Sequence, residues 1–115
     1  MEAVSMQIET YAKGNYQVLH ITEGDSKISD LSELQDLIAG YLKRGRCNIA
    51  VSFKDASYIY SGAIRVLIHC CKMIAQAGGE LCIIEPNPEL FDVLELLNID
   101  RVIKIYVSEE YLPKE

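Results

Sequence analysis

Two short segments of this sequence carry residues whose types and spacing could do chemistry. The run His69-Cys70-Cys71 places thiols beside an imidazole, as a thiol enzyme or part of a zinc site would. The segment Lys54–Gly62 gathers one carboxylate and several hydroxyls, which suits polar contact with a partner or chemistry at a hydroxyl. The side chains in question are those of Asp55, Ser57, Tyr58, Tyr60 and Ser61.

The thiol interpretation is the weaker of the two. Adjacent residues on a helix point to different sides, so His69, Cys70 and Cys71 do not converge on one reactant or metal ion. A nucleophilic cysteine also needs a base and a partly exposed electropositive site, whereas this run is apolar and is expected to pack in the core. We expect reduced, mostly buried thiols at the four cysteines, which form no Cys-x-x-Cys pair: Cys47, Cys70, Cys71 and Cys82.

Other catalytic signals are missing from the sequence. It contains neither G-x-x-x-x-G-K-[ST] nor G-x-G-x-x-G, and Gly78-Gly79 follows a predicted helix, where glycines mark a helix end. His20 lies among apolar strand residues with no evident metal partner. We therefore expect a protein that is not an enzyme and that uses no cofactor and no metal.

Charge and hydropathy exclude further classes. The 17 acidic and 11 basic side chains give a net charge of −6, which disfavours binding to a nucleic-acid backbone. The most apolar stretch, Val66–Ala77, is too short and too often interrupted to span a membrane, and the first seven residues lack a signal-peptide pattern. We expect one cytoplasmic domain over residues 1–115, with its core at about 6–111.

The elements that position these side chains can be predicted from periodicity. Met6–Tyr11 and Tyr16–Ile21 flank the turn signal Lys13-Gly14-Asn15 and predict a hairpin. A polar loop, Glu23–Ser29, leads to a helix with apolar positions from Leu31 to Leu42 and an end at Gly45. Its candidate caps are Ser29, Asp30 and Ser32.

From residue 48 onward strands and helices alternate. The predicted strands are Asn48–Phe53, Leu81–Ile84 and Val102–Val107; the predicted helices are Gly62–Ala77 and one that starts at Pro88 and closes at Asn98. This order predicts an α/β fold with a mixed, mostly parallel sheet, an antiparallel N-terminal hairpin strand and three to four helices. Function in such sheets gathers at the carboxyl ends of strands, where Lys54–Gly62 lies and which Gly24-Asp25-Ser26 could also reach.

The order of elements and the run from Tyr58 to Leu67 (YIYSGAIRVL) resemble the STAS domain, the fold of the bacterial anti-sigma factor antagonists. The turn Ala77-Gly78-Gly79-Glu80-Leu81 looks like the family's helix-to-strand turn, and Pro88–Arg101 looks like its third helix. The resemblance covers about Gln7 to Tyr111.

This resemblance implies partner switching in transcription regulation and signal transduction. In the family, a partner kinase that is also an anti-sigma factor phosphorylates a serine in the Lys54–Gly62 loop, using its own magnesium and ATP. The unphosphorylated protein binds the kinase and releases a sigma factor or another output, whereas the phosphorylated form does not bind. Ser61 is the expected acceptor and Ser57 the weaker candidate; no nucleic-acid partner and no membrane insertion are implied.

The family's acceptor motif can be placed here in two registers. Without gaps, Tyr60 falls on the family's Asp or first Ser, Ser61 on the serine before the acceptor and Gly62 on the acceptor itself. With a one-residue gap, Ser61 falls on the acceptor. The first register favours an alternative function, a STAS scaffold without phosphorylation or a subunit of a stressosome-like or lipid-transport-like complex.

Most residues of the expected partner surface could instead have a purely structural role. This surface consists of Asp25, Asp55, Ser57, Tyr58, Tyr60, Ser61, Gly62 and Arg65. Ser61 could serve only as an N-cap, Asp55 as a turn cap, Arg65 as a solvated surface residue, and the tyrosines as packing. The residues after Ser108 predict at most one helical turn and a tail, and apolar surface there would suit a partner or a homodimer.

Overall fold

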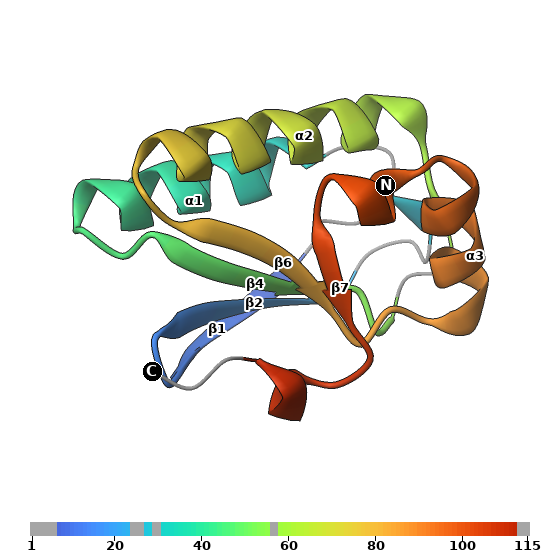
Figure 1. Ribbon diagram of the computed structural model, residues 1–115, viewed down its shortest axis with the longest axis horizontal. Helices are drawn as coiled ribbons and strands as arrows, with labels where there is room; N and C mark the ends of the chain where they lie inside the picture. The colour runs from blue at the N-terminus through green and yellow to red at the C-terminus, as the bar shows by residue number, and fades with distance from the viewer. Residues whose placement is uncertain (1–6, 24–26, 29–30, 56–57, 113–115) are drawn as a thin grey trace, which may run out of the picture.

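A five-stranded sheet with two long helices on one side organises the molecule (Figure 1). The computed structural model describes residues 7–23, 27–28, 31–55 and 58–112. The strands are β1 (Gln7–Lys13), β2 (Tyr16–Glu23), β4 (Asn48–Ser52), β6 (Glu80–Ile84) and β7 (Lys104–Tyr106), in the spatial order β1-β2-β4-β6-β7. Only β1 runs antiparallel to its neighbour, which confirms the predicted mixed α/β sheet.

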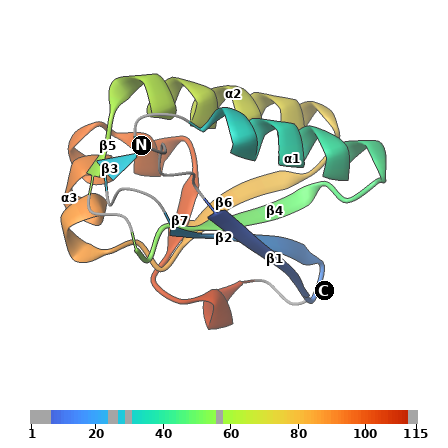
Figure 2. The ribbon, with the colours of Figure 1, turned by 180° about the vertical axis from the view of Figure 1, so that it is seen from behind.

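The helices are α1 (Ser32–Lys43), α2 (Ser61–Gln76) and α3 (Pro88–Leu96), with short 3-10 turns η1 (Ile99–Arg101) and η2 (Glu109–Tyr111). Helices α1 and α2 lie side by side over the same face of the sheet, as both views show (Figures 1 and 2). No described helix is long and apolar enough to cross a membrane.

The core lies between this helical layer and the sheet. Helix α1 contributes Leu34 and Ile38, while α2 contributes Leu67, Cys70 and Ile74, all fully buried. These positions repeat every three or four residues, so each helix buries one stripe and leaves the opposite side to solvent. The prediction that His69-Cys70-Cys71 packs in the core is only partly right: Cys70 is buried, Cys71 is half-buried and His69 is exposed.

Glycines end the first two helices as predicted. Gly45 (φ 84°) and Gly78 (φ 86°) adopt the left-handed conformation one residue beyond each helix cap. The N–H groups of Arg46 and Gly79 reach back to the carbonyls of Tyr41 and Ile74 at 2.9 Å. This is the Schellman arrangement, which satisfies carbonyls that the helix leaves unbonded.

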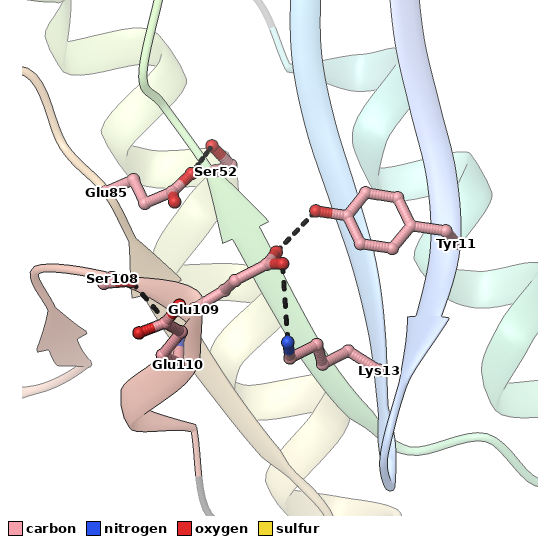
Figure 3. Close-up of polar contacts among 7 residues, drawn as sticks. All are labelled: Tyr11, Lys13, Ser52, Glu85, Ser108, Glu109 and Glu110. Atoms are coloured by element: carbon pink, nitrogen blue, oxygen red, sulfur yellow. Dashed lines mark hydrogen bonds and ion pairs between the residues drawn. The ribbon is translucent and has the colours of Figure 1, made fainter.

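The opposite face of the sheet is covered by the C-terminal segment rather than by a helix of the described chain. Leu112 is buried there against the strand residues Tyr16, Val18 and Ala50. Glu109 of η2 fixes this segment: it accepts a hydrogen bond from the Tyr11 hydroxyl at 2.5 Å and pairs with the Lys13 ammonium at 3.7 Å (Figure 3). Because none of the α-helices of the described residues covers this side of the sheet, we call it the open face.

Three element predictions need correction. The loop predicted over Glu23–Ser29 contains a two-residue strand, β3 (Lys27–Ile28), which pairs with β5 (Tyr58–Ile59) in a separate parallel sheet. Such short pairings have too few residues to show periodicity. The last strand, Lys104–Tyr106, is shorter than the predicted Val102–Val107: η1 ends at Arg101 with Val102 as its C-cap, so the strand begins later. Ser32 is the first residue of α1 rather than its cap, which is Leu31; Ser29 and Asp30 lie outside the described residues.

Candidate partner-binding site

The candidate loop starts at the carboxyl end of β4, as the alternation of strands and helices predicts. Phe53 follows the strand and is fully buried, with its N–H donating to the Ile84 carbonyl at 3.4 Å. Lys54 and Asp55 are exposed. The buried phenyl ring therefore anchors the beginning of the loop while the next two side chains face solvent.

The end of the loop is held by the β3–β5 pairing. Lys27 aligns with Tyr58 and Ile28 with Ile59, and Ile59 is buried in the core beside α3. This pairing brings Lys27 and Ile28 beside the end of the candidate loop, whereas Gly24-Asp25-Ser26 lies outside the described residues. Asp25 and Ser57 themselves, and the side chain of Tyr58, lie outside the described part of the structure.

Ser61 is the first residue of α2 and is exposed. The interpretation of Ser61 as the N-cap is wrong, because Tyr60 occupies that position. Tyr60 is extended (φ −86°, ψ 161°), and its carbonyl accepts the first intrahelical bond from the Ile64 N–H at 3.0 Å. The Ser61 hydroxyl thus stands at a helix N-terminus without having the role of a cap.

The surroundings of Ser61 suit an anion. The first N–H groups of an α-helix have no intrahelical acceptor, and the helix dipole places partial positive charge there. The first turn of α2 contains no acidic side chain. Arg65, also exposed, lies four residues after Ser61 and hence on the same side of the helix. Gly62, the residue after Ser61, is exposed as well.

Tyr60 offers a large, partly solvated aromatic surface beside Ser61. Its side chain is 44% exposed, whereas the preceding residue, Ile59, is buried. Such amphipathic rings are common anchors of protein interfaces. The described members of the predicted surface that are exposed are therefore Asp55, Tyr60, Ser61, Gly62 and Arg65.

Sequence reasoning missed a second set of contacts at the same edge. His20 Nε2 lies 3.4 Å from the Asp55 carboxylate, and His20 Nδ1 lies 4.0 Å from Glu9. The Nε2 atom is buried and the geometry toward Asp55 does not make a hydrogen bond. The alternation of β2, which buries Leu19 and Ile21 under the helices, could have shown that His20 points to the open face.

Ser52 and Glu85 complete this edge. The Ser52 hydroxyl is buried and lies 3.5 Å from a Glu85 carboxylate oxygen (Figure 3). Glu85 has a left-handed backbone (φ 52°), and its N–H donates to the Tyr106 carbonyl at 2.9 Å. A positive φ at a non-glycine residue is not visible in sequence.

The thiols of Cys70, Cys71 and Cys82 are poorly suited to catalysis. Burial raises the pKa of Cys70 to about 11 and that of Cys82 to about 12, and it also raises the pKa of Cys71. A raised pKa keeps these sulfurs protonated at neutral pH, and the thiolate is the reactive form. Within the described residues, no three His, Cys, Asp or Glu side chains are grouped so as to hold a metal ion.

Comparison with known proteins supports the resemblance stated above. The chain is 33% identical over 66 residues to a Thermotoga maritima protein provisionally named an anti-sigma factor antagonist; the match spans 57% of this chain and only 58% of that relative. It is 25% identical over 108 residues to the anti-sigma F factor antagonist of Paenibacillus polymyxa, covering 92% and 91% of the two chains.

The fold is shared with a solved structure as well. The Bacillus cell fate determinant SpoIIAA in its phosphorylated form superimposes with a TM-score of 0.64 at 14% identity, over 92% of this chain and 94% of that one. At this identity the likeness concerns the fold alone. Because the family model of the STAS domain matches residues 7–112, nearly the whole sequence, this chain belongs to the STAS domain family.

Proposed function

We propose that this chain is an anti-sigma factor antagonist that binds a kinase-type anti-sigma factor through the edge formed by Asp55, Tyr60, Ser61, Gly62 and Arg65. Asp25, Ser57 and Tyr58 complete the proposed surface from the neighbouring segments. The proposal is supported by relatives that carry this name and by the exposure of these side chains.

The observation that carries the proposal is the place of Ser61, exposed at the first position of α2. The partner would bring Mg·ATP, and the Ser61 Oγ would attack its γ-phosphorus. The bond from that phosphorus to the bridging oxygen breaks, ADP leaves, and the serine proton passes to a base of the kinase.

The same position explains how one phosphate could act as a switch without damaging the fold. The new dianion gains from the helix N–H groups and dipole, and Arg65 lies within reach on the same side of α2. Against a docked partner it adds charge that must be desolvated and that repels acidic side chains. Binding is thus lost while the domain stays folded.

The test is phosphorylation and binding with purified anti-sigma kinases of the host. Incubation with kinase, Mg²⁺ and ATP should add one phosphate, which peptide mapping places on Ser61. Ser61→Ala should abolish it, and Ser57→Ala is the matched control that should retain it. Calorimetry should show binding for wild type and Ser61→Ala and at least about tenfold weaker binding for Ser61→Asp.

The outcomes separate the two functions. A phosphate on Ser57 would keep the switch but move its site. Binding that is unaffected by Ser61→Asp, together with no phosphate, would overturn the switch and favour the scaffold function, for which Gly62 in the gapless register is the motivating observation.

A further inference from the structure

Among the strands of the described residues, β1 pairs with β2 alone and so forms one edge of the main sheet. It is seven residues long, and Thr10, Tyr11 and Ala12 are exposed along it. Figure 2 shows β1 in front at the margin of the sheet, with nothing of the drawn ribbon beside its outer side. A long exposed edge strand is a template for pairing with another strand.

The hairpin turn determines which backbone groups point outward from β1. Gly14 has φ 60° and Asn15 does not have a positive φ, as in a type II′ turn of two residues. In such a hairpin the flanking pair, Lys13 and Tyr16, is hydrogen-bonded, and bonded pairs alternate along the strands. The N–H and C=O groups of Thr10 and Ala12 therefore face away from β2, toward the side on which no strand of the described residues pairs with β1.

The side chains on the open face carry a charge pattern. Lys13 and Tyr11 both contact Glu109 there (Figure 3), and Glu9 lies near His20 on the same face. Along the strand this gives a carboxylate, a tyrosine and an ammonium at alternate positions 9, 11 and 13. The two charges are about 13 Å apart within one chain, so they do not pair with each other.

We propose that a second copy of this chain pairs with β1, antiparallel and with the two-fold axis at Tyr11. In this register Glu9 of each copy lies opposite Lys13 of the other, and the two Tyr11 rings face each other. Thr10 and Ala12 then exchange backbone hydrogen bonds across the axis. Opposite charges and aromatic rings are favourable cross-strand pairs.

The neighbouring registers are worse for identifiable reasons. An axis at Glu9 or at Lys13 places like charges directly opposite each other, which is destabilising. An axis at Thr10 or at Ala12 leaves Glu9 and Lys13 without an oppositely charged partner in the other copy. The charge pattern thus selects the axis at Tyr11 and a second copy as the occupant. Because the contact uses no residue of the proposed partner-binding site, its failure leaves that function untouched.

The test is sedimentation equilibrium of the full chain in reducing buffer. Wild type should show a reversible monomer–dimer equilibrium. Glu9→Lys and Lys13→Glu each convert both attractive pairs to repulsive ones and should raise the dissociation constant at least about tenfold. Lys72→Glu on the exposed side of α2 makes the same charge change away from β1 and should leave it unchanged.

Mixing the two single variants gives the decisive result. Strand β1 of E9K then carries lysine at positions 9 and 13, whereas that of K13E carries glutamate at both. An equimolar mixture of E9K and K13E should therefore form heterodimers although neither variant dimerises alone. The double variant E9K/K13E should regain the wild-type equilibrium. Thermal unfolding of each variant confirms that it is folded, since Lys13 and Glu9 also contact Glu109 and His20.

A backbone variant keeps the proposal testable if the charge variants unfold. Ala12→Pro removes an outward N–H, and proline is tolerated on edge strands, so it should abolish the dimer in a folded chain. A wild type that stays monomeric at every concentration, a mixture that does not associate, or a dimer insensitive to Ala12→Pro would each overturn the proposal.

Discussion

His20 on β2 and Asp55 in the loop after β4 lie 3.4 Å apart, Nε2 to Oδ2, so the imidazole stands beside the loop that leads to Ser61. The two residues are 35 positions apart, and only the parallel pairing of β2 with β4 brings them together. Asp55 thus has a structural partner as well as an exposed surface.

We expect Asp55→Asn to cost little stability, at most about 1 kcal/mol, because Asp55 is half exposed and surface ion pairs contribute little. Urea unfolding of D55N, H20N and the double variant measures the coupling between the two residues. Lys54→Gln, at the exposed neighbour, is the control. A coupling above about 2 kcal/mol would contradict this view of the pair.

Gly79→Ala should destabilise the fold severely. A Cβ built on Gly79 would lie 1.7 Å from the backbone oxygen of Cys47, so the turn after α2 and the start of β4 would have to separate. We expect a loss of about 3 kcal/mol or more in the free energy of unfolding.

Gly40→Ala is the matched control for Gly79. Gly40 lies inside α1, and a Cβ there meets nothing within 4 Å. Because alanine is the better helix former, this variant should gain up to about 1 kcal/mol. Equal effects of the two substitutions in chemical unfolding would show that close packing at Cys47 is not what fixes residue 79.

Tyr11 should ionise late in an alkaline titration. Burial of the ring and, after it, the hydrogen bond to the Glu109 carboxylate together raise the pKa of Tyr11 to about 12. A raised folded pKa favours the protonated form, so this contact stabilises the fold below about pH 10 and the stabilisation is lost as the pH rises through about 12. Ultraviolet titration of wild type, Tyr11→Phe and Glu109→Gln measures this.

In that titration Tyr11→Phe should remove one late-ionising group, the Tyr11 phenol itself. Glu109→Gln should move the same group to lower pH, because the carboxylate no longer opposes the phenolate. Tyr111→Phe, at an exposed ring of η2, is the control and should leave the late-ionising group of Tyr11 unchanged. A Glu109→Gln profile identical to wild type would contradict the assignment.

Cys70 and Cys82 should resist thiol reagents in the native protein near pH 8. Both side chains are buried, and burial holds their pKa values at about 11 and about 12. Mass spectrometry after timed alkylation should find them modified only in denaturant. Rapid modification of either in the folded state would revive the thiol-enzyme hypothesis.

Much of the fold follows from local patterns. The hairpin at Gly14 and the helix ends at Gly45 and Gly78 were predictable, because turn and capping chemistry acts over a few residues. The place of Lys54–Gly62 at the carboxyl edge of the sheet follows from the alternation of strands and helices. The family resemblance then pointed to Ser61.

Tertiary structure alone decided the rest. The β3–β5 pairing, the approach of His20 to Asp55 and the left-handed backbone of Glu85 depend on segments far apart in sequence. Likewise, the sequence permitted Ser61 as a cap, but the extended backbone of Tyr60 made Tyr60 the cap and Ser61 the first helical residue. Local pattern determines what a segment can form, whereas contacts between segments determine where each element begins and which side chains meet.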